Sequence, residues 1–228
     1  MKTNELQAIL FDLDGTLIEA RDRLLASCRQ ALRQLAMDEL DEATCWEAFQ
    51  AYNVGRLVPR RMREPFYALL LECYNTYTGE VKLIPGVIEA LRFCRERGYK
   101  TAVMTARTSS PEQVRAELGR VGLASFIDVI KTQAGVPVMG TLAKDERLLE
   151  AIEELRTTPD QSLYVGDLPD DISSARRAGL RISVAVLSGG INRELLAVRE
   201  PDVILSSISE LPKYLITGHG EARRMFHL

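Results

Sequence analysis

Histidine and paired cysteines are scarce in this chain of 228 residues. Its two histidines, His219 and His227, both lie in the C-terminal tail, so histidine catalysis and a histidine-ligated zinc site are not expected. The four cysteines form no Cys-x-x-Cys pair and are interpreted as reduced thiols in apolar, helix-like patterns. They are Cys28, Cys45, Cys73 and Cys94.

The sequence also lacks a long apolar run and an excess of positive charge. No stretch is long enough to span a bilayer, and residues 1–5 are too few and too polar for a signal peptide. A formal net charge of -3 gives no reason to propose nucleic-acid binding. We therefore expect a cytoplasmic protein, monomeric or homodimeric, that binds neither nucleic acid nor membrane.

Two phosphate-binding signatures are missing as well. No Gly-x-Gly-x-x-Gly follows the first predicted strand, and no Gly-x-x-x-x-Gly-Lys loop occurs, so dinucleotide-binding and P-loop chemistry lose their main support. Lysine is rare, and nearly all the positive charge is carried by arginine. Each lysine is therefore informative.

What is present is an alternation of apolar runs and amphipathic helical patterns. Strands are expected at 6–11, 99–105, 126–130, 162–165, 182–187 and 203–205. Helices between them predict an α/β protein with a Rossmann-like, doubly wound parallel sheet. The 46% of hydrophobic residues suit a substantial buried core.

The alternation is interrupted after the first strand by a long helical stretch. Helices are expected at about 21–37, from 41 onward and after Pro65. Aromatic side chains such as Trp46, Phe49 and Phe66 are predicted to form the core of a helical bundle rather than a platform for a ligand. The stretch reads as an all-helical insertion.

The first strand ends in two carboxylates and a glycine, Asp12, Asp14 and Gly15. Residues two apart on a strand project to the same side, and ligands of α/β sheets bind at strand C-termini. Asp at such a position often only begins a turn. Adjacent carboxylates repel, however, and one would be enough to end a strand, so a functional pair is favoured.

Further acidic groups follow a later strand. Asp167 comes directly after Gly166, and Asp171 lies one turn into the next predicted helix. Carboxylates that converge without histidine or cysteine partners favour a hard octahedral ion, hence Mg²⁺. The intervening Asp170 is interpreted only as a complement to the helix N-terminus.

These motifs, in this order, resemble those of the haloacid dehalogenase-like hydrolase superfamily, and the phosphoglycolate phosphatase-like subfamily in particular. The resemblance implies a core domain at 1–18 and 84–228 with a helical cap domain at 19–83. It implies that Asp12 attacks phosphorus to give an aspartyl-phosphate. Asp14 would act as general acid and base, with its backbone carbonyl as a metal ligand.

The resemblance assigns the remaining site residues too. Thr105 and the following Ala106 would bind the phosphate, and Asp167 and Asp171 would bind the metal, Asp171 through water. Lys144 matches the phosphate-neutralising lysine, although Asp145 follows it where relatives often have proline.

In the cap, Arg56 and Arg60 are candidates for holding an anionic substrate group. An equal alternative is that these arginines only form the basic, solvent-exposed start of a helix. The segment 17–80 contains no lysine and no histidine, unlike the caps of phosphonate-cleaving members and of β-phosphoglucomutases respectively. Asp14 argues against a dehalogenase, which needs no general acid there.

The sequence therefore predicts a Mg²⁺-dependent phosphatase of a small phosphorylated metabolite: a phosphoglycolate-like compound, a sugar phosphate or a nucleotide. The alternatives are a phosphomutase or pyrophosphatase of the same superfamily, a receiver-like phospho-switch and a binding protein without turnover. The tail 218–228 is either frayed or a docking segment.

Overall fold

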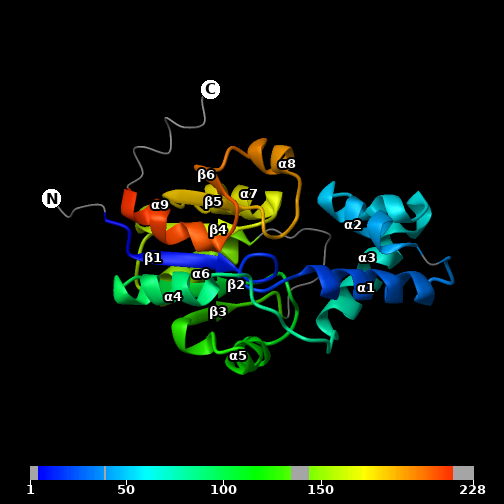
Figure 1. The fold of residues 1–228 in the computed structure, drawn as a ribbon, viewed down its shortest axis with the longest axis horizontal. Helices are drawn as coiled ribbons and strands as arrows, with labels where there is room; N and C mark the ends of the chain where they lie inside the picture. The colour runs from blue at the N-terminus through cyan, green and yellow to red at the C-terminus, as the bar shows by residue number, and fades with distance from the viewer. Residues whose placement is uncertain (1–4, 39, 135–143, 218–228) are drawn as a thin grey trace.

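A parallel sheet of six strands forms the centre of the computed structural model, which describes residues 5–38, 40–134 and 144–217 (Figure 1). The order along the sheet is β3-β2-β1-β4-β5-β6, and each neighbouring pair is parallel. The predicted Rossmann-like fold with an inserted helical unit is confirmed. The strands are β1 (Ala8–Asp12), β2 (Lys100–Met104), β3 (Val129–Lys131), β4 (Ser162–Gly166), β5 (Ile182–Val186) and β6 (Val203–Leu205).

Helices cover both faces of this sheet because its central strands are apolar on both sides. Ile9 and Phe11 of β1 pack on one face with α4 (Val87–Glu96), α5 (Pro111–Arg120) and α9 (Leu211–Thr217). Ala8 and Leu10 pack on the opposite face with α6 (Asp145–Glu154) and α7 (Pro169–Arg177). A short helix α8 (Arg193–Ala197), which the sequence pattern did not predict, precedes β6.

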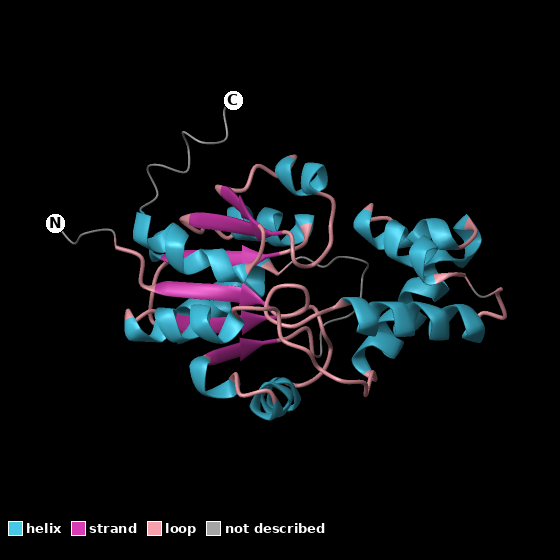
Figure 2. Cartoon of the chain, in the orientation of Figure 1, coloured by secondary structure: helices cyan, strands magenta, loops and turns pink. Residues whose placement is uncertain are grey.

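The helical insertion consists of α1 (Arg21–Gln34), α2 (Glu42–Gln50) and α3 (Arg63–Asn75), with 3-10 turns at Val54–Leu57 and Arg60–Met62. The strand arrowheads point toward it, so the insertion lies at the C-terminal edge of the sheet (Figure 2). It has a core of its own around Phe66, which is fully buried and belongs to the same apolar cluster as Leu32 and Leu70.

The chain enters and leaves the insertion side by side. Ile18 and Leu83 form an antiparallel bridge, flanked by a bond from the Glu19 N–H to the Lys82 carbonyl of 2.8 Å. The Ile84 N–H donates to the Leu17 carbonyl at 3.0 Å on the other side. The predicted domain boundaries at 18/19 and 83/84 fall on this bridge and stay a prediction.

Local signals set several element ends. Ser110 caps α5 by accepting from the Gln113 N–H at 3.3 Å, with Pro111 in the first position, as predicted. Helix α3 begins at Arg63 rather than after Pro65. Proline is tolerated there because the first-turn N–H groups have no intrahelical acceptor.

Two predicted elements are shorter or shifted. The first insertion helix ends at Gln34 rather than near residue 37, because Ala36 takes a left-handed conformation with φ 52°. Strand β3 begins at Val129, not Phe126, because residues Ala124–Phe126 form a 3-10 turn before the chain reaches β2.

The prediction for the aromatic residues holds for Phe66 but is wrong for Phe49. Phe49 packs with Ile172 and Leu196 of the sheet domain, and it stacks on Trp46 with ring centroids 5.2 Å apart. Trp46 packs partly on the insertion and partly against Gly190, where a Cβ would come within 2.3 Å of the indole. One aromatic edge of the insertion therefore contacts the sheet domain.

All four cysteines are free and buried, as predicted. Within the described ranges, no helix combines the length and the apolar character that crossing a bilayer requires. His219, His227 and the tail 218–228 lie outside the described residues.

Candidate active site

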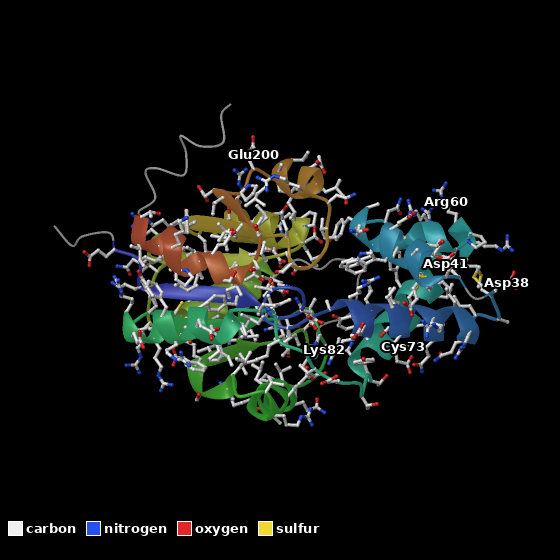
Figure 3. The ribbon with its side chains drawn as sticks, in the orientation of Figure 1. Asp38, Asp41, Arg60, Cys73, Lys82 and Glu200 are labelled. Carbon is white, nitrogen blue, oxygen red and sulfur yellow. The ribbon has the colours of Figure 1, made fainter. Side chains whose placement is uncertain are left out.

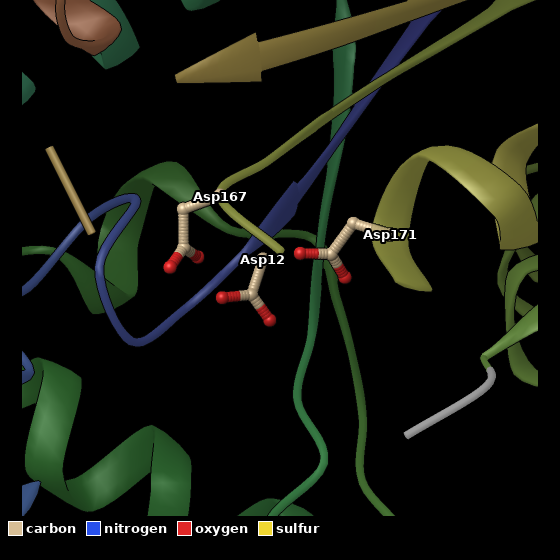
Figure 4. Close-up of side chains that lie close together, drawn as sticks. All are labelled: Asp12, Asp167 and Asp171. Atoms are coloured by element: carbon tan, nitrogen blue, oxygen red, sulfur yellow. The ribbon is translucent and has the colours of Figure 1, made fainter. Parts of the chain in front are cut away.

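Three buried carboxylates meet where the strand order reverses. Strands β1 and β4 are neighbours whose connections run in opposite directions, which creates a crevice at their C-terminal ends. Asp12 ends β1, Asp167 follows β4, and Asp171 lies in the first turn of α7. The three side chains point toward one another (Figure 4), and one oxygen of each lies within 4.8 Å of the others.

Asp167 lies in a cradle made by two glycines. A Cβ added to Gly15 would come within 2.4 Å of Asp167 Oδ2, and one added to Gly189 within 1.9 Å. Gly15 also has φ +90°, a conformation that favours glycine. The Thr16 hydroxyl donates to Asp167 Oδ1 at 3.3 Å, so this carboxylate is both confined and hydrogen-bonded.

Asp171 is fixed by the start of α7. Its Oδ2 accepts from the Leu168 N–H at 3.0 Å, while Pro169 occupies the first helical position. Its Oδ1 accepts from the Tyr164 hydroxyl at 3.1 Å. Asp170, in the same turn, instead lies against Tyr52 of the helical insertion.

Lys144 reaches the same cluster. Its ammonium donates to Asp12 Oδ1, to Asp171 Oδ1 at 2.8 Å and to the Tyr164 hydroxyl at 3.3 Å, and the residue is only 2% exposed. Asp145, which stands where relatives often have proline, pairs with Arg177 at 2.9 Å.

Lys131 is the other lysine near this part of the chain. It forms an ion pair with Glu154 of α6 at 2.8 Å. The structure thus brings Lys144, not Lys131, to Asp12.

The burial and proximity of these charged groups shift their pKa values. Burial raises the pKa of Asp12 to about 7, against the opposing effect of Lys144. Burial and the nearby Asp12 and Asp171 carboxylates also raise the pKa of Asp167 well above its usual value. Burial lowers the pKa of Lys144, but Asp12 and Asp171 outweigh it and hold that pKa above its usual range. The cluster thus holds three carboxylates and one ammonium, which donates to Asp12 and Asp171.

This arrangement fits a divalent cation with a preference for oxygen. Each of the three residues offers a carboxylate oxygen, and among the described residues neither histidine nor cysteine joins the group. A hard ion such as Mg²⁺ takes such donors, and its charge would offset the excess of negative charge. The residues present therefore fit the predicted metal.

Thr105 lies beside the cluster. The register of β1 and β2 pairs Asp12 with Met104, which places Thr105 one residue beyond the end of the neighbouring strand. Its side chain is buried, and its hydroxyl oxygen accepts from the Arg107 N–H at 3.2 Å. Ala106 lies between them and is partly buried.

Asp14 is paired with an arginine that the sequence analysis missed. Arg107 donates from Nε to Asp14 Oδ2 at 2.7 Å and from a terminal nitrogen to Oδ1 at 2.5 Å. Burial acts to raise the pKa of Asp14, but the guanidinium outweighs it and holds that pKa below its usual value. The available signal was an arginine two residues after a strand-end threonine.

Tyr164 was missed too. It is a fully buried tyrosine within a strand that otherwise reads as apolar, and a buried hydroxyl needs a partner. Its partners, Lys144 and Asp171, lie on other elements, so the pairing follows from the fold and not from spacing.

The two predicted insertion arginines are not brought to the strand ends. The side chain of Arg56 is 42% exposed and lies 3.8 Å from Glu47. Arg60 is exposed, and Figure 3 shows it on the part of the insertion that is remote from the sheet. Their role in substrate binding stays a prediction.

Comparison with known proteins places this chain in a family. The chain is 30% identical over 211 residues to a phosphoglycolate phosphatase of Synechococcus elongatus, covering 90% of this chain and 95% of the relative. It is 25% identical over 219 residues to the pyrophosphatase PpaX of Bacillus mycoides, covering 91% and 95%.

A solved haloacid dehalogenase-like family hydrolase from Streptococcus pneumoniae superposes with a TM-score of 0.74 at 20% identity, covering 92% of this chain and 98% of that one. This likeness supports the fold. The sequence profile described as haloacid dehalogenase-like hydrolase matches residues 9–185. The chain therefore belongs to the haloacid dehalogenase-like hydrolases, the family that its motifs predicted.

Proposed function

We propose that the protein is a Mg²⁺-dependent phosphatase that hydrolyses a small phosphorylated metabolite through an aspartyl-phosphate on Asp12. The observation that carries this proposal is the convergence of Asp12, Lys144 and the Asp167–Asp171 pair at one buried point. Family membership and the phosphatase relatives support the same class of reaction.

The metal would be held by the side chains of Asp12 and Asp167 and the backbone carbonyl of Asp14, with Asp171 acting through water. Bound there, Mg²⁺ would neutralise phosphate oxygens and so let a carboxylate approach phosphorus. Among the protein's own groups, the Lys144 ammonium, the Thr105 hydroxyl and the Ala106 N–H would bind the remaining phosphate oxygens.

In the first step an Asp12 oxygen forms a bond to phosphorus while the bond from phosphorus to the ester oxygen breaks. Asp14 gives its proton to that leaving oxygen. In the second step Asp14 takes a proton from water, whose oxygen attacks phosphorus and releases Asp12 and inorganic phosphate. Each residue begins and ends the cycle in the same state.

Asp12 is held by the central sheet and not by the helical insertion. It ends a central strand whose neighbours on both sides are β2 and β4, and it is 4% exposed. The insertion lies over the same edge of the sheet and would select the substrate (Figure 2). We also propose the boundaries 19–83 for this selecting unit.

The test is phosphate release from a panel of phosphomonoesters, with Mg²⁺ or with EDTA. The panel includes 4-nitrophenyl phosphate, phosphoglycolate, sugar phosphates and nucleotides. Asp12→Asn should abolish release, whereas Asp160→Asn should retain it. Asp160 is exposed in the 3-10 turn Pro159–Gln161, which precedes β4 and so lies at the opposite edge of the sheet. Release that persists in EDTA or in Asp12→Asn would defeat the proposal.

A second candidate substrate is inorganic pyrophosphate, because one of the relatives is named pyrophosphatase PpaX. Adding pyrophosphate to the panel separates the two. A catalytic efficiency for pyrophosphate well above that for each carbon ester would favour the pyrophosphatase.

A phosphomutase would instead move the phosphoryl group to a second site on a sugar, so sugar phosphates in the panel should be analysed for isomers as well as for free phosphate. A phospho-switch would accept phosphate from acetyl phosphate on Asp12 and would not turn over.

A further inference from the structure

A row of alternating charges joins Asp14 to the helical insertion. Arg107 bonds both oxygens of Asp14, and its other terminal nitrogen donates to Glu117 Oε1 at 2.9 Å. The same Glu117 oxygen accepts from Arg23 of α1 at 3.1 Å. The row therefore runs from the loop after β1, through the loop after β2 and helix α5, to the first helix of the insertion.

The members of this row are buried and share an aromatic ring. The side chains of Arg107 and Arg23 are 3% and 5% exposed, and those of Asp14 and Glu117 are 13% and 15% exposed. Both guanidinium groups lie over Tyr74 of α3, at 6.0 and 5.4 Å from the ring centroid. Arginine stays charged in such surroundings, so each cation depends on its partners in the row.

The contact between Arg107 and Asp14 is a two-point contact. A guanidinium that donates two parallel N–H bonds to a carboxylate fixes the plane of that carboxylate as well as its position. When Asp14 carries a proton, its unprotonated oxygen can still accept from Arg107 while the protonated oxygen donates toward the leaving oxygen. A single ammonium could not impose the same orientation.

From this geometry, and resting on the proposed phosphatase function, we infer that Arg107 is a positioning residue for Asp14. Glu117 in turn fixes Arg107, and Arg23 connects both to the helical insertion. A general acid has to lie within hydrogen-bond reach of the leaving oxygen, and a displacement of about 1 Å can cost about 100-fold in rate. Arg107 acts on the reaction through Asp14.

The leaving group distinguishes positioning from mere support of the fold. Phenolate leaves with difficulty unless it receives a proton, whereas 4-nitrophenolate leaves readily without one. A change that misplaces Asp14 should therefore slow phenyl phosphate far more than 4-nitrophenyl phosphate. A change that only destabilises the fold should slow both esters by the same factor.

The experiment compares kcat/KM for the two esters, with Mg²⁺, in wild type and in Arg107→Met, Arg107→Lys and Glu117→Gln. For Arg107→Met we expect a loss of about 100-fold with phenyl phosphate and of less than about 10-fold with 4-nitrophenyl phosphate, because general acid catalysis contributes about 10²- to 10⁴-fold. Arg107→Lys should recover part of the loss, because lysine keeps the positive charge but cannot donate two parallel N–H bonds to Asp14. Glu117→Gln should show a smaller change in the same direction.

Arg115→Met is the matched control. Arg115 lies on α5 and donates to the carbonyl oxygens of Ile127 and Asp128 at 3.0 and 3.1 Å, so its loss removes an arginine that supports the fold. The ratio of the two kcat/KM values should stay at its wild-type level in this variant.

Equal losses for the two esters in a folded Arg107→Met protein would overturn the inference. Folding is checked by circular dichroism and thermal unfolding. If Arg107→Met does not fold, Glu117→Gln decides by the same ratio, and an unchanged ratio there overturns the inference as well. A wild type that releases no phosphate from either ester defeats the proposed function and this inference with it, and that result cannot be confused with equal losses in a variant.

Discussion

Replacing Gly189 by alanine would place a methyl group where the Asp167 carboxylate now lies. The added Cβ would be 1.9 Å from Oδ2, 2.4 Å from Cγ and 2.6 Å from Cβ of Asp167. Rotation of the carboxylate alone cannot relieve the clash, because the Asp167 Cβ itself is too close. Gly189 has no positive φ, so alanine suits its backbone and the effect comes from contact rather than backbone strain.

The size of the effect follows from the distances. Non-bonded carbon atoms pack at about 3.5–4.0 Å, so Asp167 has to move by about 1 Å or more. Overpacking of this kind costs about 1–3 kcal/mol of stability. A misplacement of about 1 Å costs about 100-fold in rate, and a displaced metal ligand should also raise the Mg²⁺ concentration needed for half-maximal activity.

Two measurements decide the outcome: phosphate release as Mg²⁺ is titrated, and the unfolding free energy. Gly119→Ala is the control. Gly119 lies in α5, where an added Cβ would meet nothing closer than Ala124 Cβ at 4.0 Å, and alanine there should stabilise the helix by about 0.5–1 kcal/mol. Wild-type activity and Mg²⁺ dependence in Gly189→Ala would show that the position of Asp167 does not matter, and would refute the metal-site reasoning.

Further predictions concern metal binding, the insertion core and the thiols. Mg²⁺ at 100 times its Kd should stabilise the folded protein by about 2.7 kcal/mol and raise Tm, and Asp167→Asn should abolish this shift in a thermal scan. Phe66→Ala should cost about 3–5 kcal/mol in denaturant unfolding, because its side chain is fully buried, whereas Val198→Ala, at a site 75% exposed, should change it by less than about 0.5 kcal/mol.

Burial, reinforced by Cys45, raises the pKa of Cys28 to about 12, so iodoacetamide at pH 8 should modify it only after unfolding. The unfolded thiol loses its proton near pH 9.0, below the folded one, so raising the pH above that value should favour unfolding. Rapid modification of Cys28 in the folded protein, measured by mass spectrometry, would contradict this prediction.

The parts of the site that could be predicted are those set by local chain geometry. An apolar run ending in Asp12 predicted both the central strand and the carboxylate at its end, because strands deliver residues to one edge of a parallel sheet. The placement of Asp171 follows from the start of a helix, where its side chain accepts from the Leu168 N–H. Lys144 reaches Asp12 despite the missing proline, since Ser174 accepts its backbone N–H at 2.9 Å.

The parts that could not be predicted depend on contacts between distant segments. Arg107 meets Asp14 across 93 positions in the sequence, and the buried Tyr164 hydroxyl finds its partners, Lys144 and Asp171, on other elements. The helical spacing of Phe49 is compatible both with the core of the insertion and with a helix face that packs on the sheet domain. Its true partner became clear only when α2 was placed beside Ile172 and Leu196.

The antiparallel bridge between Ile18 and Leu83 has a consequence for how quickly the chain can fold. Strands β1 and β2 pair side by side although Ala8 and its partner Lys100 are about 90 residues apart, and such a pairing is slow when the intervening chain is loose. Because the insertion has its own core and its two ends are hydrogen-bonded together, it can fold first and shorten the effective loop to about 25 residues. The free-energy cost of closing the loop, which is entropic, then falls by about 1 kcal/mol. Early folding of α1–α3 would therefore speed assembly of the central sheet.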